Sequence, residues 1–233
     1  MGLLTKIFPT FWHYCKLCGL PSGNLICSTC FEELELLPES KCSLCKIPII
    51  NNSKICLNCE NSHIYYDNLF CTFKYATPLN KILHDFKYKG NVVHSSLLGL
   101  LLYQNLATLA HITDYDLIIP TPLHKDKLKQ RGFNQSDKIL DYTRGMIKKL
   151  PINNKILIRC KNTDAQAQTK LADRNHNLTD AFKLTCNSRD ISGLKILLVD
   201  DVVTTGATIN CIAQLLKSNG AATVDACCLM RTV

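Results

Sequence analysis

The sequence has no long apolar run, since no stretch of its 233 residues reaches the length that a membrane-spanning helix needs. The longest apolar run, 97–103, is typical of a helix buried in a core. A signal-peptide layout is also missing, because Trp12 and Cys15 stand where a small-residue cleavage site belongs. Position 6 lacks the Ser or Thr of a myristoylation signal. We therefore expect a cytoplasmic protein without membrane insertion.

The sequence contains no G-x-x-x-x-G-K-[ST] run, which excludes a P-loop nucleotide-binding protein. No cysteine has a convincing histidine partner in the sequence, so no cysteine nucleophile is expected. Six of the 14 cysteines are scattered and mostly have apolar neighbours, which predicts buried thiols. They are Cys71, Cys160, Cys186, Cys211, Cys227 and Cys228.

The other eight cysteines form four C-x-x-C pairs within the first 59 residues. In a cytoplasmic protein this spacing is typical of metal binding rather than of disulfides. Each C-x-x-C turn supplies two thiolates, so four turns predict two closed, structural zinc sites. Pairing in sequence order gives two pairs to each site, and interleaved pairing also fits. The predicted ligands are Cys15, Cys18, Cys27, Cys30, Cys42, Cys45, Cys56 and Cys59.

This cysteine-rich segment has few large apolar side chains, so metal must supply much of its folding energy. A short amphipathic helix is predicted over 31–37, between its two halves. A redox role for the pairs is disfavoured because the expected βαβ context is missing. The formal net charge of +8 overstates how basic the protein is, because zinc-bound thiolates would offset part of it. A nucleic-acid interface would therefore depend on local basic patches.

Beyond residue 64 the composition changes, and strands alternate with helices. This alternation predicts an α/β fold with a doubly wound, largely parallel sheet. The chain is thus expected to form two domains, a double zinc ribbon over 1–64 and a sheet domain over 65–233. Strands are predicted over 69–75, 115–119, 155–159, 196–199 and 223–229, and helices over 78–86, 97–110 and from about 125 to 149.

The most informative stretch is 196–209, where a buried strand precedes two carboxylates, a Thr/Gly-rich loop and a helix beginning near Ala207. Ligands bind beyond the carboxyl ends of strands in open α/β sheets, and a helix start favours phosphate. Asp200 and Asp201 repel each other, which a ribose diol, a cation or both would relieve. An ordinary strand-to-helix turn is the alternative.

The complete arrangement resembles the signature loop of type I phosphoribosyltransferases, which bind 5-phosphoribosyl-1-pyrophosphate (PRPP). We call 204–208 the PRPP loop. The predicted ligand-binding residues of this stretch are Asp200, Asp201, Val202, Thr204, Thr205, Gly206, Ala207 and Thr208.

Further segments match the ComF family in order, and the chain resembles that family from end to end. The resemblance implies a double zinc ribbon followed by a type I phosphoribosyltransferase-like domain. One departure is Thr169, where leucine is expected. The matching segments are 86–90, 120–123, 131–135, Thr163 with Gln166, Arg174 with Asn177 and Leu178, and Ala181 with Phe182.

The resemblance also implies roles for individual residues. Thr121 and nearby backbone N–H groups would hold pyrophosphate, and the Arg131 guanidinium matches phosphate in a bidentate manner. A lid over 161–177 would bring Arg174 to the ligand, unless Arg174 pairs with Asp173. In an active enzyme Asp200 and Asp201 would be the catalytic residues, and Mg²⁺ would bridge the pyrophosphate.

The ComF resemblance implies a function in natural competence, namely handling of single-stranded DNA in the cytoplasm during DNA uptake. A helicase or another DNA-processing protein is the expected partner. The alternative is an active phosphoribosyltransferase of nucleotide salvage or synthesis, whose acceptor the sequence does not indicate, so catalysis itself stays open. The candidate DNA contacts are Lys125, Lys127, Lys129 and Arg131, although the lysines also fit a solvated helix face.

Overall fold

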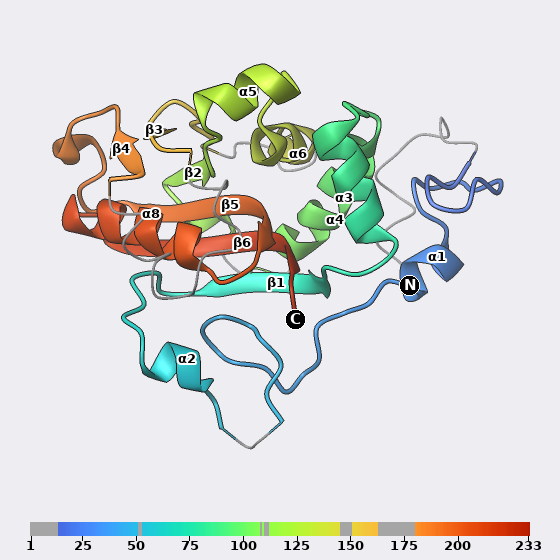
Figure 1. Cartoon of the computed structure of the whole chain (residues 1–233), viewed down its shortest axis with the longest axis horizontal. Helices are drawn as coiled ribbons and strands as arrows, with labels where there is room; N and C mark the ends of the chain where they lie inside the picture. The colour runs from blue at the N-terminus through green and yellow to red at the C-terminus, as the bar shows by residue number, and fades with distance from the viewer. Residues whose placement is uncertain (1–13, 51–52, 108, 110–111, 145–150, 163–179) are drawn as a thin grey trace.

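A parallel sheet of four strands lies at the centre of the protein, in the order β1-β6-β5-β2 (Figure 1). Its strands are β1 (Leu69–Lys74), β2 (Leu117–Pro120), β5 (Lys195–Val203) and β6 (Thr223–Arg231). The predicted doubly wound α/β fold is thereby confirmed. The computed structural model describes residues 14–50, 53–107, 109, 112–144, 151–162 and 180–233.

Strand β5 contributes to two separate cores because successive side chains of a strand point to opposite faces. Leu197 and Val199 join the core under α3 (Leu79–Tyr88), α4 (His94–Ala107) and α6 (Gln135–Arg144). Ile196 and Leu198 join the core under α8 (Ala207–Ser218) on the other face. Burying each such side chain stabilises the fold by about 1.5–3 kcal/mol.

Helix α4 confirms that the apolar run 97–103 belongs to a core helix, since Leu97, Leu98 and Leu101 are fully buried. Gly99 lets α4 approach α6 closely, because a Cβ at this position would lie 2.6 Å from Cβ of Tyr142. In the described part of the chain, no helix has the length and hydropathy needed to cross a bilayer.

The single helix predicted from about 125 to 149 is wrong. The chain forms α5 (Lys125–Arg131) and then α6, with Gly132 between them in the left-handed region at a φ of 79°. Asn134 starts α6, because its side-chain oxygen accepts a hydrogen bond from the Ser136 N–H at 3.2 Å. Residues 145–150, the predicted end of this helix, lie outside the described residues.

Two of the predicted strands also need correction. The strand predicted over 155–159 is β3 (Leu157–Arg159), and it pairs antiparallel with β4 (Phe182–Leu184), outside the main sheet. Strand β5 does not end at Val199, because its pairing with β6 continues to Val203. The two carboxylates therefore lie within the strand and share its rigidity.

The N-terminal segment contains two short helices, α1 (Ser28–Glu32) and α2 (Leu57–Glu60), and the helix predicted over 31–37 is wrong. Helix α1 begins earlier because the thiol of Cys27 accepts the Cys30 N–H at its start. Residues 35–37 run extended beside β1 instead, with Leu36 paired to Phe73. Two 3-10 turns complete the described elements, Ile112–Asp114 and Ser188–Asp190.

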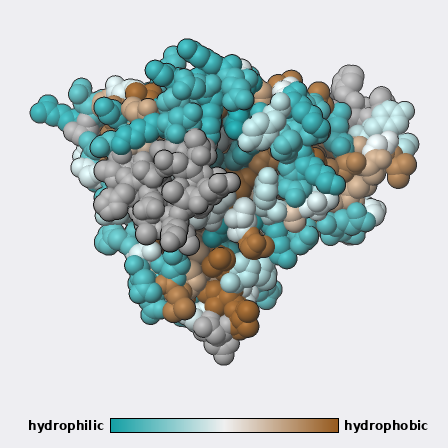
Figure 2. Space-filling view, viewed as in Figure 1, coloured by the Kyte–Doolittle hydropathy of each residue, from teal (hydrophilic) through white to brown (hydrophobic). Residues whose placement is uncertain are grey.

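The surface differs between the two ends of the molecule. Polar side chains cover the region of α5, whereas apolar side chains gather below the sheet, around the second cysteine cluster (Figure 2). Ile50, Ile55 and Leu57 are exposed in that region. A basic patch is therefore to be sought at the α5 end.

Candidate functional site

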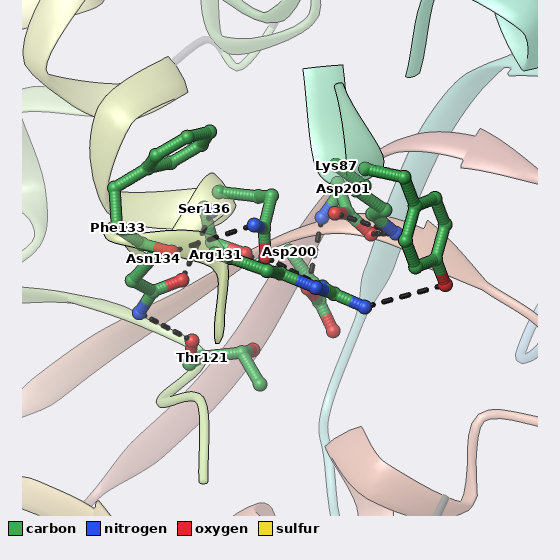
Figure 3. A network of polar contacts seen from close by, with 10 residues as sticks. Lys87, Thr121, Arg131, Phe133, Asn134, Ser136, Asp200 and Asp201 are labelled. Atoms are coloured by element: carbon green, nitrogen blue, oxygen red, sulfur yellow. Dashed lines mark hydrogen bonds and ion pairs between the residues drawn. The ribbon is translucent and has the colours of Figure 1, made fainter. Parts of the chain in front are cut away.

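A cavity of about 350 Å³ lies where the carboxyl ends of β5 and β2 meet. This is the edge at which open α/β sheets bind ligands. Asp200 and Asp201 enter the cavity from β5, and Thr121 enters it from the loop after β2 (Figure 3). Val202, Thr204, Thr208 and Arg131 also line the cavity, so it unites most of the residues predicted to bind PRPP.

Lys87, from the end of α3, forms a two-pronged ion pair with Asp201. Its ammonium lies 2.9 Å from Oδ1 and 2.8 Å from Oδ2 of that carboxylate. Asp201 is only 7% exposed, so water screens this pair weakly. Sequence reasoning assigned no role to Lys87, although it belongs to the segment 86–90 that matched the family.

Asp200 has a different environment. Its Oδ1 accepts hydrogen bonds from Ser136 Oγ at 3.0 Å and from the Asp201 N–H at 2.9 Å. Burial and the charge of Asp201 raise the pKa of Asp200 to about 6, against the opposing effect of Lys87 and these hydrogen bonds. Near neutral pH the pair therefore has an incompletely compensated carboxylate, suited to a cation or to the hydroxyl donors of a diol.

Arg131 lies beside the carboxylates and is held by two neighbours (Figure 3). Its Nη1 donates to Gln135 Oε1 at 2.9 Å, and its Nη2 donates to the Tyr88 hydroxyl at 3.3 Å. The guanidinium also stacks 4.9 Å from the centre of the Tyr88 ring. Its Nε is buried and has no hydrogen-bond partner among the described residues. A buried donor of this kind is costly unless a ligand or water completes it.

Thr121 presents a second such group. Its hydroxyl oxygen is buried and has no partner within the described part of the protein. Its backbone N–H, in contrast, already donates to Val199 O at 2.8 Å, so only the hydroxyl is available to a ligand. Asn134 fixes the loop by donating its Nδ2 to Thr121 O at 3.0 Å. The segment 131–136 thus builds one wall of the cavity.

The PRPP loop connects β5 to α8. Gly206 takes a φ of 80° and precedes the first helical residue, Ala207, as predicted. The Ala207 N–H donates to Thr205 Oγ1 at 3.3 Å. Thr204 and Thr208 face the cavity, whereas Thr205, Gly206 and Ala207 border a second hollow of about 750 Å³ on the side of the second cysteine cluster. The loop therefore has a different neighbour on each side.

The basic residues near the cavity form two groups. Lys125 and Lys129 are exposed on α5 and do not line the cavity. Burial, followed by the charges of Arg159, Arg131 and Lys87, lowers the pKa of Lys127 to about 8. Arg159, from β3, lines the cavity and was not predicted, because nothing in the sequence places its hairpin there. Arg174 and most of the predicted lid lie outside the described residues.

The eight paired cysteines form two clusters in sequence order, which confirms the sequential pairing. Within each cluster the four sulfur atoms all lie within 4.8 Å of one another, close enough to hold one metal ion. Backbone N–H groups point at the sulfurs, for example from Leu17 and Cys27 to Cys15 Sγ at 3.4 Å each. The first cluster is Cys15, Cys18, Cys27 and Cys30, and the second is Cys42, Cys45, Cys56 and Cys59.

Backbone donors also prepare one thiolate in each cluster. Burial by itself would raise the pKa of Cys15, but the N–H groups of Cys18, Cys27 and Leu17 outweigh it and lower the pKa to about 6. The pKa of Cys42 is lowered to about 7 by the same balance. Because a metal takes thiolates rather than thiols as ligands, both clusters fit a thiolate-bound metal.

Comparison with known proteins gives consistent matches. Residues 144–232 match the family described as phosphoribosyl transferase domain. Among solved structures, a hypoxanthine phosphoribosyltransferase from Staphylococcus aureus aligns with a TM-score of 0.37, at 14% identity, over 57% of this chain and 62% of that chain.

Three curated relatives match over most of their length. DNA utilization protein YhgH of Salmonella typhimurium is 32% identical over 94% of this chain and 97% of its own. Competence protein F of Haemophilus influenzae is 30% identical over 84% of this chain and 86% of its own. Competence protein ComFC of Bacillus subtilis is 25% identical over 91% of this chain and 87% of its own. Because this similarity extends over nearly the whole chain, the protein belongs to the ComF/YhgH family, whose members here are named for DNA utilization and competence.

Proposed function

We propose that this protein binds PRPP in the cavity between β5 and β2 and handles single-stranded DNA during DNA uptake in the cytoplasm. The observation that supports PRPP most is the pair of buried groups without partners, Thr121 Oγ1 and Arg131 Nε, beside two carboxylates. Phosphate oxygens would complete the two donors, and the ribose 2′- and 3′-hydroxyls would donate to the carboxylates. Mg²⁺, when bound, would neutralise pyrophosphate near Asp200 and Asp201.

Isothermal titration calorimetry with PRPP and Mg²⁺ tests this site directly. We expect saturable binding of PRPP, weaker binding of ribose 5-phosphate, and still weaker binding of 2-deoxyribose 5-phosphate, which lacks the hydroxyl for one carboxylate. Equal affinity for the two sugar phosphates would contradict the role of the acidic pair. The variant Lys195→Ala is the control, because Lys195 is exposed at the opposite, amino end of β5.

Single-stranded DNA requires a different surface from the acidic pair, since deoxyribose lacks the vicinal diol. The residues that support a DNA surface are on α5, where Lys125 and Lys129 are exposed. Tyr88, which is 60% exposed beside Arg131, offers a ring on which a base can stack. The two ligands would therefore occupy adjacent places and would compete or cooperate.

Fluorescence anisotropy with a labelled oligonucleotide at several salt concentrations tests the DNA surface. Replacing Lys125 and Lys129 together by alanine is expected to weaken binding and to reduce the magnitude of the slope of log affinity against log salt by about 1. The control Lys195→Ala should leave the slope unchanged. A slope that is flat in the wild type, or that is insensitive to both replacements, counts against DNA contact at α5.

An active phosphoribosyltransferase is the second candidate. The second hollow supports it, because this space of about 750 Å³ borders Thr205, Gly206 and Ala207 and offers room for an acceptor beside the loop. Release of pyrophosphate from PRPP across a panel of acceptors tests it, with the Asp200→Asn/Asp201→Asn double variant as the inactive reference. No release above that reference would leave PRPP binding without transfer. Zinc is the metal proposed for both clusters, and metal analysis of the purified protein tests this with an expected two ions per chain.

A further inference from the structure

Arg231 connects the second cysteine cluster to the strand that supports the PRPP loop. It is the last residue of β6 and only 4% exposed. Its Nε donates to the carbonyl oxygen of Cys45 at 2.8 Å, and its Nη1 donates to the carbonyl oxygen of Val203 at 3.1 Å. Cys45 belongs to the second cluster, and Val203 immediately precedes the PRPP loop. One side chain thus bridges the two sites.

The charge of Arg231 strengthens this connection. No described carboxylate forms an ion pair with its guanidinium, so carbonyl oxygens alone offset a buried positive charge. A divalent ion with four thiolates has a net charge of about −2, which would provide the missing counter-charge. Loss of that ion would leave a buried cation poorly compensated, a situation that is costly in a protein interior.

A second contact joins the same two sites. Tyr66, a buried residue of the segment between the second cluster and β1, places its hydroxyl beside Gly206, at 3.8 Å from where a Cβ would stand. The first cluster has no such contact, since the hydrogen bonds of its four cysteines all stay within residues 15–31. Two chemically similar clusters therefore differ in their connection to the loop.

We infer that Arg231 is a positioning residue through which the second metal cluster, and not the first, holds the PRPP loop in its ligand-binding form. The inference rests on the proposed function, because it takes 204–208 as the ligand loop. Coupling between two sites is reciprocal: if metal in the second cluster favours binding at the loop, a ligand at the loop must retain that metal. Couplings of this kind typically change affinity by about 5-fold or more.

Zinc release from the full-length, zinc-loaded protein tests the coupling. A colorimetric chelator would follow release with and without saturating PRPP and Mg²⁺, and the variant Cys18→Ser would identify the phase that belongs to the first cluster. We expect PRPP to slow release from the second cluster about 5-fold and to leave the first cluster unchanged. Arg231→Lys should remove this difference, whereas Arg189→Lys, at an exposed position, should preserve it.

Hydrogen exchange of the 204–208 amides separates this inference from the proposed function. Removal of zinc from the second cluster should increase their exchange, and removal from the first cluster should not. PRPP that binds without affecting either zinc phase would overturn the inference and leave the proposed function intact. If PRPP does not bind, the proposed function fails, and the exchange measurement alone decides: unchanged loop exchange after loss of the second zinc overturns the coupling, even if Arg231→Lys does not fold.

Discussion

Asp200 and Asp201 are adjacent in the chain but have opposite electrostatic environments. Asp201 pairs with Lys87 through both oxygens, whereas Asp200 accepts its side-chain hydrogen bond from the neutral hydroxyl of Ser136. The strand that positions both carboxylates thus presents one compensated and one poorly compensated charge. Substituting each residue in turn should therefore change stability in opposite directions.

The variant Asp200→Asn is expected to be more stable than the wild type at pH 8, by about 2 kcal/mol. The pKa of Asp200 is raised from 3.8 to about 6, so the folded state binds the proton more tightly than the unfolded state does. Wild-type stability is therefore lost as pH rises through this window, and the advantage of the variant should shrink below pH 6. Urea unfolding at pH 5.5, 7 and 8 measures it, and a gap independent of pH would contradict the assignment.

The variant Asp201→Asn is expected to be less stable, by about 2 kcal/mol or more, because it leaves the Lys87 ammonium without its carboxylate. The double variant Lys87→Met/Asp201→Asn should recover much of this loss, since it removes both charges. A double-mutant cycle by urea unfolding at pH 7 gives the coupling energy. Additive effects of the two substitutions would show that the ion pair is not an energetic unit.

The variant Thr121→Val should weaken PRPP binding by about 10-fold without lowering the free energy of unfolding. Valine has the same shape and removes a hydroxyl that has no partner in the described structure. Calorimetric titration and urea unfolding measure the two effects. Thr143→Val is the matched control, because the buried Thr143 hydroxyl donates to Leu140 O at 2.7 Å. The control should lose stability and keep its affinity for PRPP.

The variant Gly206→Ala should lower both stability and PRPP affinity. Its φ of 80° is in the left-handed region, where a Cβ costs about 1–2 kcal/mol. Gly193 has a similar φ of 77° and open space around it, so Gly193→Ala should lose comparable stability with normal binding. Equal loss of affinity in both variants would mean that the effect is general destabilisation.

The local parts of this structure were predictable from sequence, and the non-local parts were not. Both cysteine clusters follow from spacing, because a C-x-x-C turn places two sulfurs together without help from the rest of the chain. The helix start at Ala207 follows from a Gly that takes a positive φ. The end of β5 was misplaced because its last residues are held by pairing with β6, which no local pattern in β5 reveals.

The candidate site shows the same division. Asp200, Asp201 and Thr121 were predicted because each follows directly from its strand, and the structure brings them together. Lys87 and Arg159 were missed because they reach the cavity from a helix and from a separate hairpin. A charged residue gains such a role only through the packing of distant segments, and its own neighbours in sequence give no sign of it.

The pairing of residues 35–37 with β1 has a consequence for the outer edge of the sheet. Strand β1 is the last strand on its side, and an edge strand with free N–H and C=O groups invites association with other chains. Leu37 N–H donates to Thr72 O, and Lys74 N–H donates to Glu35 O, both at 2.8 Å, so the segment between the two clusters covers this edge. The cysteine-rich segment therefore also protects the sheet from aggregation, and a chain shortened to begin after it would expose β1 to its neighbours.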